Sequence, residues 1–243
     1  MPPGTDTQDP IAPWMRGWRG ALLILAGALV FRYVCHCLML IPVLCNELRP
    51  APSPPDLLLA HVPFVPWVGR WNYLLWLACY LPPALYLLHR DRRLFVRFVI
   101  LDGAVSLIRG LCIPLTGLGP PRGPDLNGLH PFDLWQTWLT VVNPISAIVG
   151  NGAGAYLTKD MFFSGHIATT FLLYLFSRRL GRASRVYLAL QLVSLAVVLL
   201  SHLHYSIDIV GAYAVVFCVY TIGDAALSRR FAALREPPSA TPP

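Results

Sequence analysis

The stretch Ala21–Leu44, ALLILAGALVFRYVCHCLMLIPVL, decides what kind of protein this is. In these 24 residues Arg32 is the only Lys, Arg, Asp or Glu. About 20 consecutive apolar residues in a helix are enough to cross the hydrocarbon core of a bilayer. The stretch is therefore predicted to be a transmembrane helix.

Five further apolar runs are predicted to form helices of the same kind. Over the whole chain of 243 residues, 56% are hydrophobic, 13% are charged, and the mean hydropathy is +0.56. This composition is far from that of a soluble domain and predicts an all-α, polytopic integral membrane protein with six transmembrane helices within residues 20–228. The five runs are Trp71–Leu88, Leu94–Leu118, Phe162–Phe176, Val186–Ser201 and Leu203–Leu227.

Three other segments complete this organisation. Residues 1–19 and 229–243 are predicted to be disordered cytoplasmic tails, because their ends are polar and rich in proline. The stretch Leu134–Gly150 is apolar enough to be a seventh crossing, but Asn143-Pro144 in its middle favours a broken or interfacial helix.

The net charge of +7 comes from arginines in short clusters between the apolar runs, which indicates a membrane topology and not a nucleic-acid-binding face. With six crossings, the clusters fall on one side of the membrane. The positive-inside rule then places both termini in the cytoplasm and the opposite loops on the exoplasmic, periplasmic or lumenal face. The clustered arginines are Arg16, Arg19, Arg90, Arg92, Arg93, Arg97, Arg178, Arg179, Arg182, Arg185, Arg229, Arg230 and Arg235.

Two short motifs place ionisable side chains at the exoplasmic mouths of apolar runs, where they are costly to keep without a function. They are Phe163-Ser164-Gly165-His166 and His204-Tyr205-Ser206-Ile207-Asp208. At a spacing of four residues on a helix, Asp208 can accept the Nδ1–H of His204 and leave Nε2 as a nucleophile. His166 can then act as the general acid and base. His166, His204 and Asp208 are therefore the predicted catalytic residues.

The chain resembles the sphingomyelin synthase family, the branch of the PAP2-like lipid phosphatase superfamily that moves phosphoalcohol head groups between lipids. The two histidine motifs carry this resemblance together with three other segments, which precede them in the sequence. These are Pro54-Pro55-Asp56-Leu57-Leu58-Leu59 with His61 and Pro63, Arg109–Cys112 with Pro114, Thr116 and Pro120-Pro121, and Asp160 shortly before Phe163.

This resemblance implies transfer of a phosphocholine or phosphoethanolamine head group through a phosphohistidine formed on His204. The expected partners are a phosphatidylcholine or phosphatidylethanolamine donor and a ceramide or diacylglycerol-type acceptor. No metal or other cofactor is expected, because protonation of the leaving group and fixed positive groups can carry the charge. The expected substrate-binding residues are Arg109, Asp56, Ser164 and Tyr205.

Two departures from related patterns keep alternatives open. Lipid phosphatases of the wider superfamily have an arginine six residues before the second histidine, where this chain has Val198, which disfavours a phosphate monoester as substrate. The family's Cys-Gly-Asp is Thr158-Lys159-Asp160 here, so the acceptor is not specified. The alternatives are hydrolysis of the phospholipase C or lipid phosphatase type and a non-enzymatic phospholipid-binding or transport protein. A homo-oligomer is also compatible with the sequence.

Overall fold

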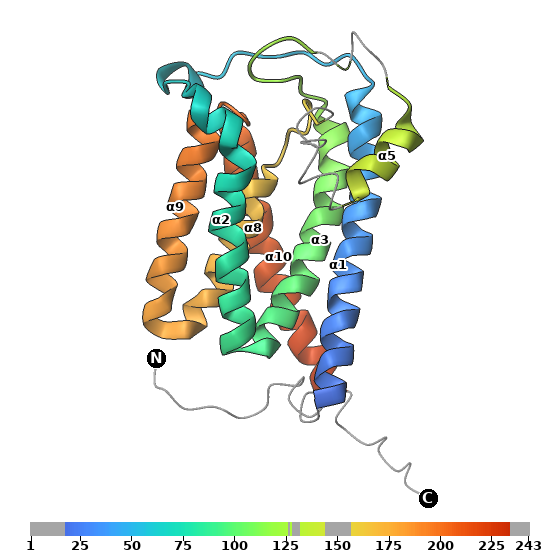
Figure 1. The fold of residues 1–243 in the computed structure, drawn as a ribbon, viewed down its shortest axis with the longest axis vertical. Helices are drawn as coiled ribbons and strands as arrows, with labels where there is room; N and C mark the ends of the chain where they lie inside the picture. Colours follow the sequence, from blue (N-terminus) through green and yellow to red (C-terminus); the bar gives the residue numbers. More distant parts are fainter. Residues whose placement is uncertain (1–17, 126, 128–131, 144–156, 234–243) are drawn as a thin grey trace, which may run out of the picture.

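The computed structural model describes residues 18–125, 127, 132–143 and 157–233. Six long helices form an elongated bundle (Figure 1) and lie where the apolar runs predicted them. They are α1 (Trp18–Glu47), α2 (Pro66–Arg90), α3 (Arg92–Thr116), α8 (Gly165–Ser177), α9 (Ser184–Leu200) and α10 (Ser206–Ala233). The chain is thus an all-helical membrane bundle in its described part, as the composition predicted.

Membrane character is supported by four stretches that are long and apolar enough to cross a bilayer by length and composition. They are Trp18–Glu47, Arg92–Thr116, Gly165–Leu200 and Ser206–Ser228. The third contains both α8 and α9, which are joined by the short helix η2 (Arg178–Ala183) with Gly181 at a φ of 60°. α2 is not among the four, so exactly six crossings stay a prediction although the chain is a multi-pass membrane protein.

The surface of the bundle is apolar over most of its length. Leu23, Leu115 and Ile222 are among many large hydrophobic side chains that point outward. A soluble protein rarely exposes so much contiguous apolar surface, whereas lipid tails cover it without cost. The interior is filled mainly by α3, α8 and α10, with Phe98 and Phe176 fully buried at its centre.

Local signals explain where the helices begin and end. The Asp91 side chain accepts hydrogen bonds from the backbone N–H groups of Arg93 and Leu94, so it separates α2 from α3 and caps the start of α3. Gly117 ends α3 in the left-handed conformation, at a φ of 57°. The predicted starts of two runs were too early, because α8 begins at Gly165 after its cap Ser164 and α10 begins at Ser206.

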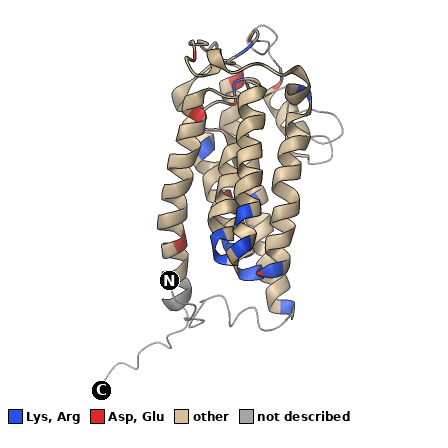
Figure 2. Cartoon of the chain, turned by 90° about the vertical axis from the view of Figure 1, so that its left-hand side faces the viewer, with Lys and Arg blue, Asp and Glu red and all other residues tan. Residues whose placement is uncertain are grey.

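The bundle has two distinct ends. α1 begins and α10 ends at the lower end in Figure 1, and Figure 2 shows more of the Lys and Arg residues toward this end. Here Asp224 pairs with Arg97 and Arg179, which ties α10 to α3 and to η2. The starts of α8 and α10 lie at the other end. This asymmetry agrees with cytoplasmic termini, which stay a prediction.

The short helix α5 (Leu134–Val142) lies against α1 on the side of the histidine motifs (Figure 1). Trp138 Nε1–H donates to the carbonyl of Cys37 at 2.9 Å, and the Tyr33 hydroxyl donates to that of Val142 at 2.9 Å. The remainder of the predicted Leu134–Gly150 segment, from residue 144, lies outside the described residues, as do residues 1–17 and 234–243 of the predicted tails.

Candidate active site

The site lies where the N-termini of α8 and α10 meet. Ser164 caps α8, since its hydroxyl accepts the backbone N–H of Ile167 at 3.4 Å. Its own backbone N–H donates to the carbonyl of Asp208, in the first turn of α10, at 3.2 Å. Ser164 and Asp208 are fully buried. One main-chain hydrogen bond therefore fixes the two motifs against each other although about forty residues separate them in the sequence.

His204 and Asp208 form the pair that their spacing predicts. His204 Nδ1 lies 3.2 Å from Asp208 Oδ2, and the same oxygen accepts the backbone N–H of Tyr205 at 3.1 Å. The pair does not lie within one helix, because α10 begins at Ser206 and His204 is in the turn before it. Asp208 instead reaches back to the residues before its helix, as a carboxylate in a helical first turn commonly does.

This geometry determines what His204 can do. A carboxylate that accepts Nδ1–H fixes the tautomer in which Nε2 carries the lone pair. It also balances the positive charge that the ring acquires when Nε2 bonds to an electrophile. His204 is thus arranged as a nucleophile or as a base.

His166 is the second residue of α8 and faces the same site. Its ring centroid lies 6.4 Å from that of His204 and 5.1 Å from that of Trp76 in α2. Its Nε2 atom is buried and has no hydrogen-bond partner among the described residues. A buried ring nitrogen of this kind is available to a bound group.

His166 and His204 both line a cavity of about 550 Å³. Its wall includes side chains of α2, of the loop after α3 and of the segment before α8, among them Arg70, Asn72, Arg122 and Asp160. The volume falls in the range of small-molecule sites. Within the described part of the chain, no three His, Cys, Asp or Glu side chains are grouped so that they could hold a metal ion.

The four predicted substrate-binding residues surround this site but are not among the residues that line the cavity. Tyr205 is buried, and its hydroxyl donates to the carbonyl of Gly119 at 3.2 Å. Ser164 acts as the helix cap described above. In this geometry both side chains hold backbone in place around His204.

Asp56 connects the loop between α1 and α2 to the start of α10. Its carboxylate accepts the backbone N–H groups of Leu58 and Leu59, at 3.0 Å each, and both the backbone N–H and the hydroxyl of Ser206. Partial burial raises the pKa of Asp56, but these hydrogen bonds outweigh burial and lower its pKa below the ordinary carboxyl value. Asp56 is thus ionised and anchors Ser206, which lies two residues after His204 in the sequence.

The guanidinium of Arg109 binds other groups of the protein. Its guanidinium lies 2.8 Å from Asp160 Oδ2, and its Nε–H donates to the carbonyl of Phe163 at 2.7 Å. Gly165 passes close by, since a Cβ atom built there would lie 3.2 Å from Arg109 Cζ. Arg109 therefore supports the backbone that carries His166 and does not project its charge into the cavity.

A buried network that the sequence reasoning missed holds the segment before α8. Glu47, at the end of α1, is fully buried and accepts hydrogen bonds from Lys159 N at 2.6 Å, Asn127 Nδ2 at 2.7 Å and Thr158 Oγ1 at 2.9 Å. Lys159 is also fully buried and donates its Nζ–H to Asp125 at 2.8 Å. A glutamate at the end of an apolar run was the available signal.

Comparisons with known proteins show what the sequence that carries this site is similar to. Residues 159–225, which include both histidine motifs, match the family model described as PAP2 superfamily C-terminal. The chain is also 25% identical over 204 residues to sphingomyelin synthase-related protein 1 of Homo sapiens and to the protein of the same name of Mus musculus. The match covers 81% of this chain, but 49% of the human and 43% of the mouse protein, so the chain spans about half the length of these relatives. The comparisons confirm the predicted resemblance to sphingomyelin synthase-like proteins of the PAP2 superfamily.

Proposed function

We propose that the protein is a membrane phosphotransferase that moves a phosphocholine or phosphoethanolamine head group from a glycerophospholipid to ceramide or another lipid alcohol. The observation that carries this proposal is the pairing of His204 Nδ1 with Asp208 at 3.2 Å while the ring of His166 lies 6.4 Å away in the same cavity. The similarity to a sphingomyelin synthase-related protein supports the same chemistry.

The first half of the reaction forms a phosphohistidine. The lone pair of His204 Nε2 attacks the phosphorus of the donor, and the bond from phosphorus to the diacylglycerol oxygen breaks. Protonated His166 gives its proton to that oxygen, so diacylglycerol leaves as a neutral alcohol. Asp208 stabilises the positive charge on the phosphorylated ring of His204.

The second half consumes this intermediate. His166, now neutral, accepts the proton of an incoming lipid hydroxyl, whose oxygen attacks the phosphorus from the face that diacylglycerol left. The phosphorus–nitrogen bond breaks and its electron pair returns to His204 Nε2. His166 is protonated again, and both histidines are ready for another donor.

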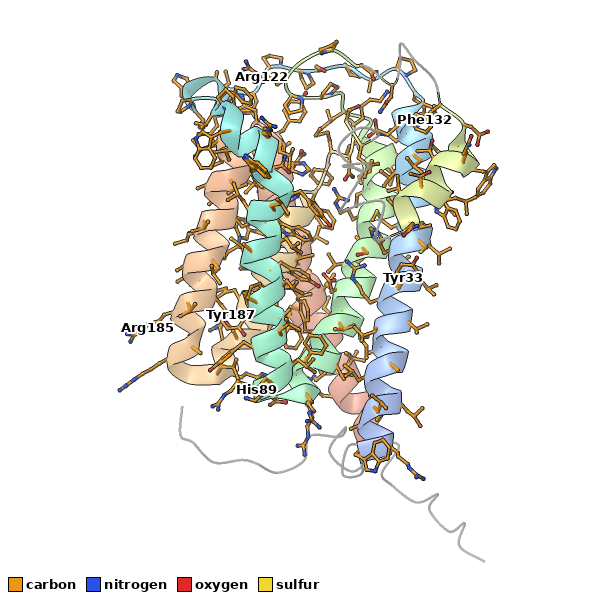
Figure 3. All side chains as sticks on the ribbon, in the orientation of Figure 1. Tyr33, His89, Arg122, Phe132, Arg185 and Tyr187 are labelled. Carbon is orange, nitrogen blue, oxygen red and sulfur yellow. The ribbon has the colours of Figure 1, made fainter. Side chains whose placement is uncertain are left out.

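The test is turnover by the purified chain in nanodiscs that contain phosphatidylcholine or phosphatidylethanolamine, with and without ceramide. Products are followed by mass spectrometry beside His204→Ala and beside His89→Ala, a matched histidine at the opposite end of the bundle (Figure 3). We expect a ceramide-dependent phosphosphingolipid that His204→Ala abolishes and His89→Ala does not change.

Other outcomes separate the alternatives. Diacylglycerol and free phosphoalcohol that appear equally without ceramide would make water the acceptor and the protein a hydrolase. Retained phospholipid binding with no turnover of either donor would contradict the enzymatic proposal and favour a binding or transport protein.

A further inference from the structure

The cavity beside the histidines carries positive charge that the chemistry above does not use. Arg70, in the first turns of α2, and Arg122, in the loop after α3, both line it. They come from segments that are far apart in the sequence and converge at the histidine end of the bundle, where Figure 3 labels Arg122. Neither belongs to the motifs that identified the site.

Of the other cations near this end, two are neutralised by carboxylates, and Arg49 is held by the Pro114 carbonyl and the Asn46 side chain. Arg109 pairs with Asp160, and Lys159 pairs with Asp125. Arg70 and Arg122 have no Asp or Glu within salt-bridge distance among the described residues. Asp160, the acidic side chain in the cavity wall, is held by Arg109. The cavity wall thus has a net positive charge.

Within the described part of the chain, the Arg122 guanidinium is held by stacking and donates no hydrogen bond. Its guanidinium carbon lies 4.0 Å from the centroid of the Phe64 ring, which meets the His202 ring edge-on at 5.5 Å between centroids. His202 in turn is fixed by a contact of 2.9 Å between its Nε2 and the carbonyl of Val62. Stacking of this kind leaves the N–H edge of a guanidinium free to bind two oxygens of one anion.

We propose that Arg70 and Arg122 form an anion subsite that binds the phosphodiester of the donor phospholipid before it reaches the histidines. A phosphodiester carries one negative charge and two free oxygens, which suit bidentate arginine recognition. The subsite stands in for Arg109, whose charge is used inside the protein. This inference rests on the proposed function, because it describes how the same cavity holds the donor.

The alternative for both side chains is a role at the membrane surface, since long arginines often extend from helix ends to lipid head groups outside a site. The two roles differ in a measurable way. A surface arginine affects any anionic membrane equally, whereas a subsite arginine changes the affinity for one bound lipid in the cavity.

The test measures binding separately from turnover, in the His204→Ala background. Isothermal titration calorimetry measures the binding of dihexanoyl phosphatidylcholine, injected below its micelle concentration, to the protein in a neutral detergent. Glycerophosphocholine and inorganic phosphate are then used as competitors to separate a diester subsite from a free-phosphate site. Arg185→Gln is the matched control, because Arg185 is exposed at the opposite end of the bundle (Figure 3).

We expect Arg70→Gln and Arg122→Gln each to weaken binding by about three- to tenfold, since charge-assisted hydrogen bonds are strong but these side chains are exposed. Arg122→Lys should retain only part of the affinity, because lysine loses the stacking and the bidentate contact. Glycerophosphocholine should compete, and Arg185→Gln should bind like the parent.

Three results would overturn the inference. These are affinity within twofold of the parent in both glutamine variants, no binding by the parent itself, or competition by inorganic phosphate but not by glycerophosphocholine. If a glutamine variant does not fold, the corresponding lysine variant provides the comparison. Binding that depends on both arginines, together with no turnover by the protein that retains His204, would leave the subsite in place and reject only the proposed reaction.

Discussion

The contact between Arg109 and Asp160 gives the sharpest prediction, because it separates a positioning role from a substrate-binding role. The side chains are 9% and 20% exposed and lie 2.8 Å apart. Removal of one partner of a fully buried ion pair costs about 3–5 kcal/mol, and the partial exposure of Asp160 reduces this to about 2 kcal/mol. For a chain of this size, Arg109→Gln should therefore lower the Tm by roughly 4–8 °C.

A double-mutant cycle isolates this pair from the other contacts of Arg109, among them the hydrogen bond to the Phe163 carbonyl. Arg109→Gln, Asp160→Asn and the double variant are compared by thermal unfolding in one detergent, with Arg185→Gln as an exposed control. The double variant should be more stable than the sum of the single effects predicts by about 1–2 kcal/mol.

Kinetics of the same variants complete the test. If Arg109 holds the backbone of Phe163 and Gly165, and through it His166, Arg109→Gln should lower kcat and change the KM for the donor little. The reasoning would be refuted by stability effects that add within about 0.5 kcal/mol together with a raised KM at unchanged kcat. Such a result would return Arg109 to the role of a direct phosphate ligand.

Three further predictions concern the pair at His204, the anchor of α10 and the packing of α1. Asp208→Asn should lower kcat by about three to four powers of ten, because the amide no longer fixes the tautomer of His204. Binding of the donor should persist, and titration of lipid into the variant checks it. Asp56→Asn should lower the Tm at pH values above the ordinary carboxyl pKa. Because the pKa of Asp56 is lowered in the folded protein, the Tm difference from the parent should vanish as the pH falls through that lowered value. A Tm difference that is independent of pH would contradict the ionised anchor. Gly110→Ala should destabilise the protein by about 1–3 kcal/mol, since its Cβ would lie 3.0 Å from the backbone of Met39 in α1, whereas Gly27→Ala, with no atom within 4 Å, should be neutral or stabilising in the same unfolding experiment.

The parts of the fold that the sequence predicted correctly are those that depend on local chemistry. Apolar runs located the six long helices because a transmembrane helix needs a continuous apolar surface. The spacing of His204 and Asp208 also predicted their contact, although the two residues do not share a helix, because Asp208 in the first turn of α10 reaches back to the residues before it. The start of α10 was predicted three residues too early, because the Asp56 side chain, about 150 residues away, binds the backbone of Ser206.

The roles of single charges depended on partners that the sequence does not identify. Arg109 lies beside a motif, but whether it meets a substrate or a carboxylate depends on the path of the segment before α8, which the buried Glu47 fixes. Lys159 is fully buried although lysine is usually exposed. A local pattern gives the type of charge and its depth, whereas the pairing is decided by tertiary contacts.

The positive-inside rule supplies an argument that connects topology to the proposed anion subsite. With the predicted cytoplasmic termini, the rule accounts for the many arginines at the end of the bundle where α1 begins and α10 ends, and it disfavours arginine at the histidine end. Arg49, Arg70, Arg109 and Arg122 are found there nevertheless. Arg49 binds the Pro114 carbonyl, and Arg109 binds Asp160, so protein contacts account for these two. Arg70 and Arg122 have no Asp or Glu partner among the described residues and line the cavity instead, so the bound phosphodiester of the proposed subsite would account for their charge.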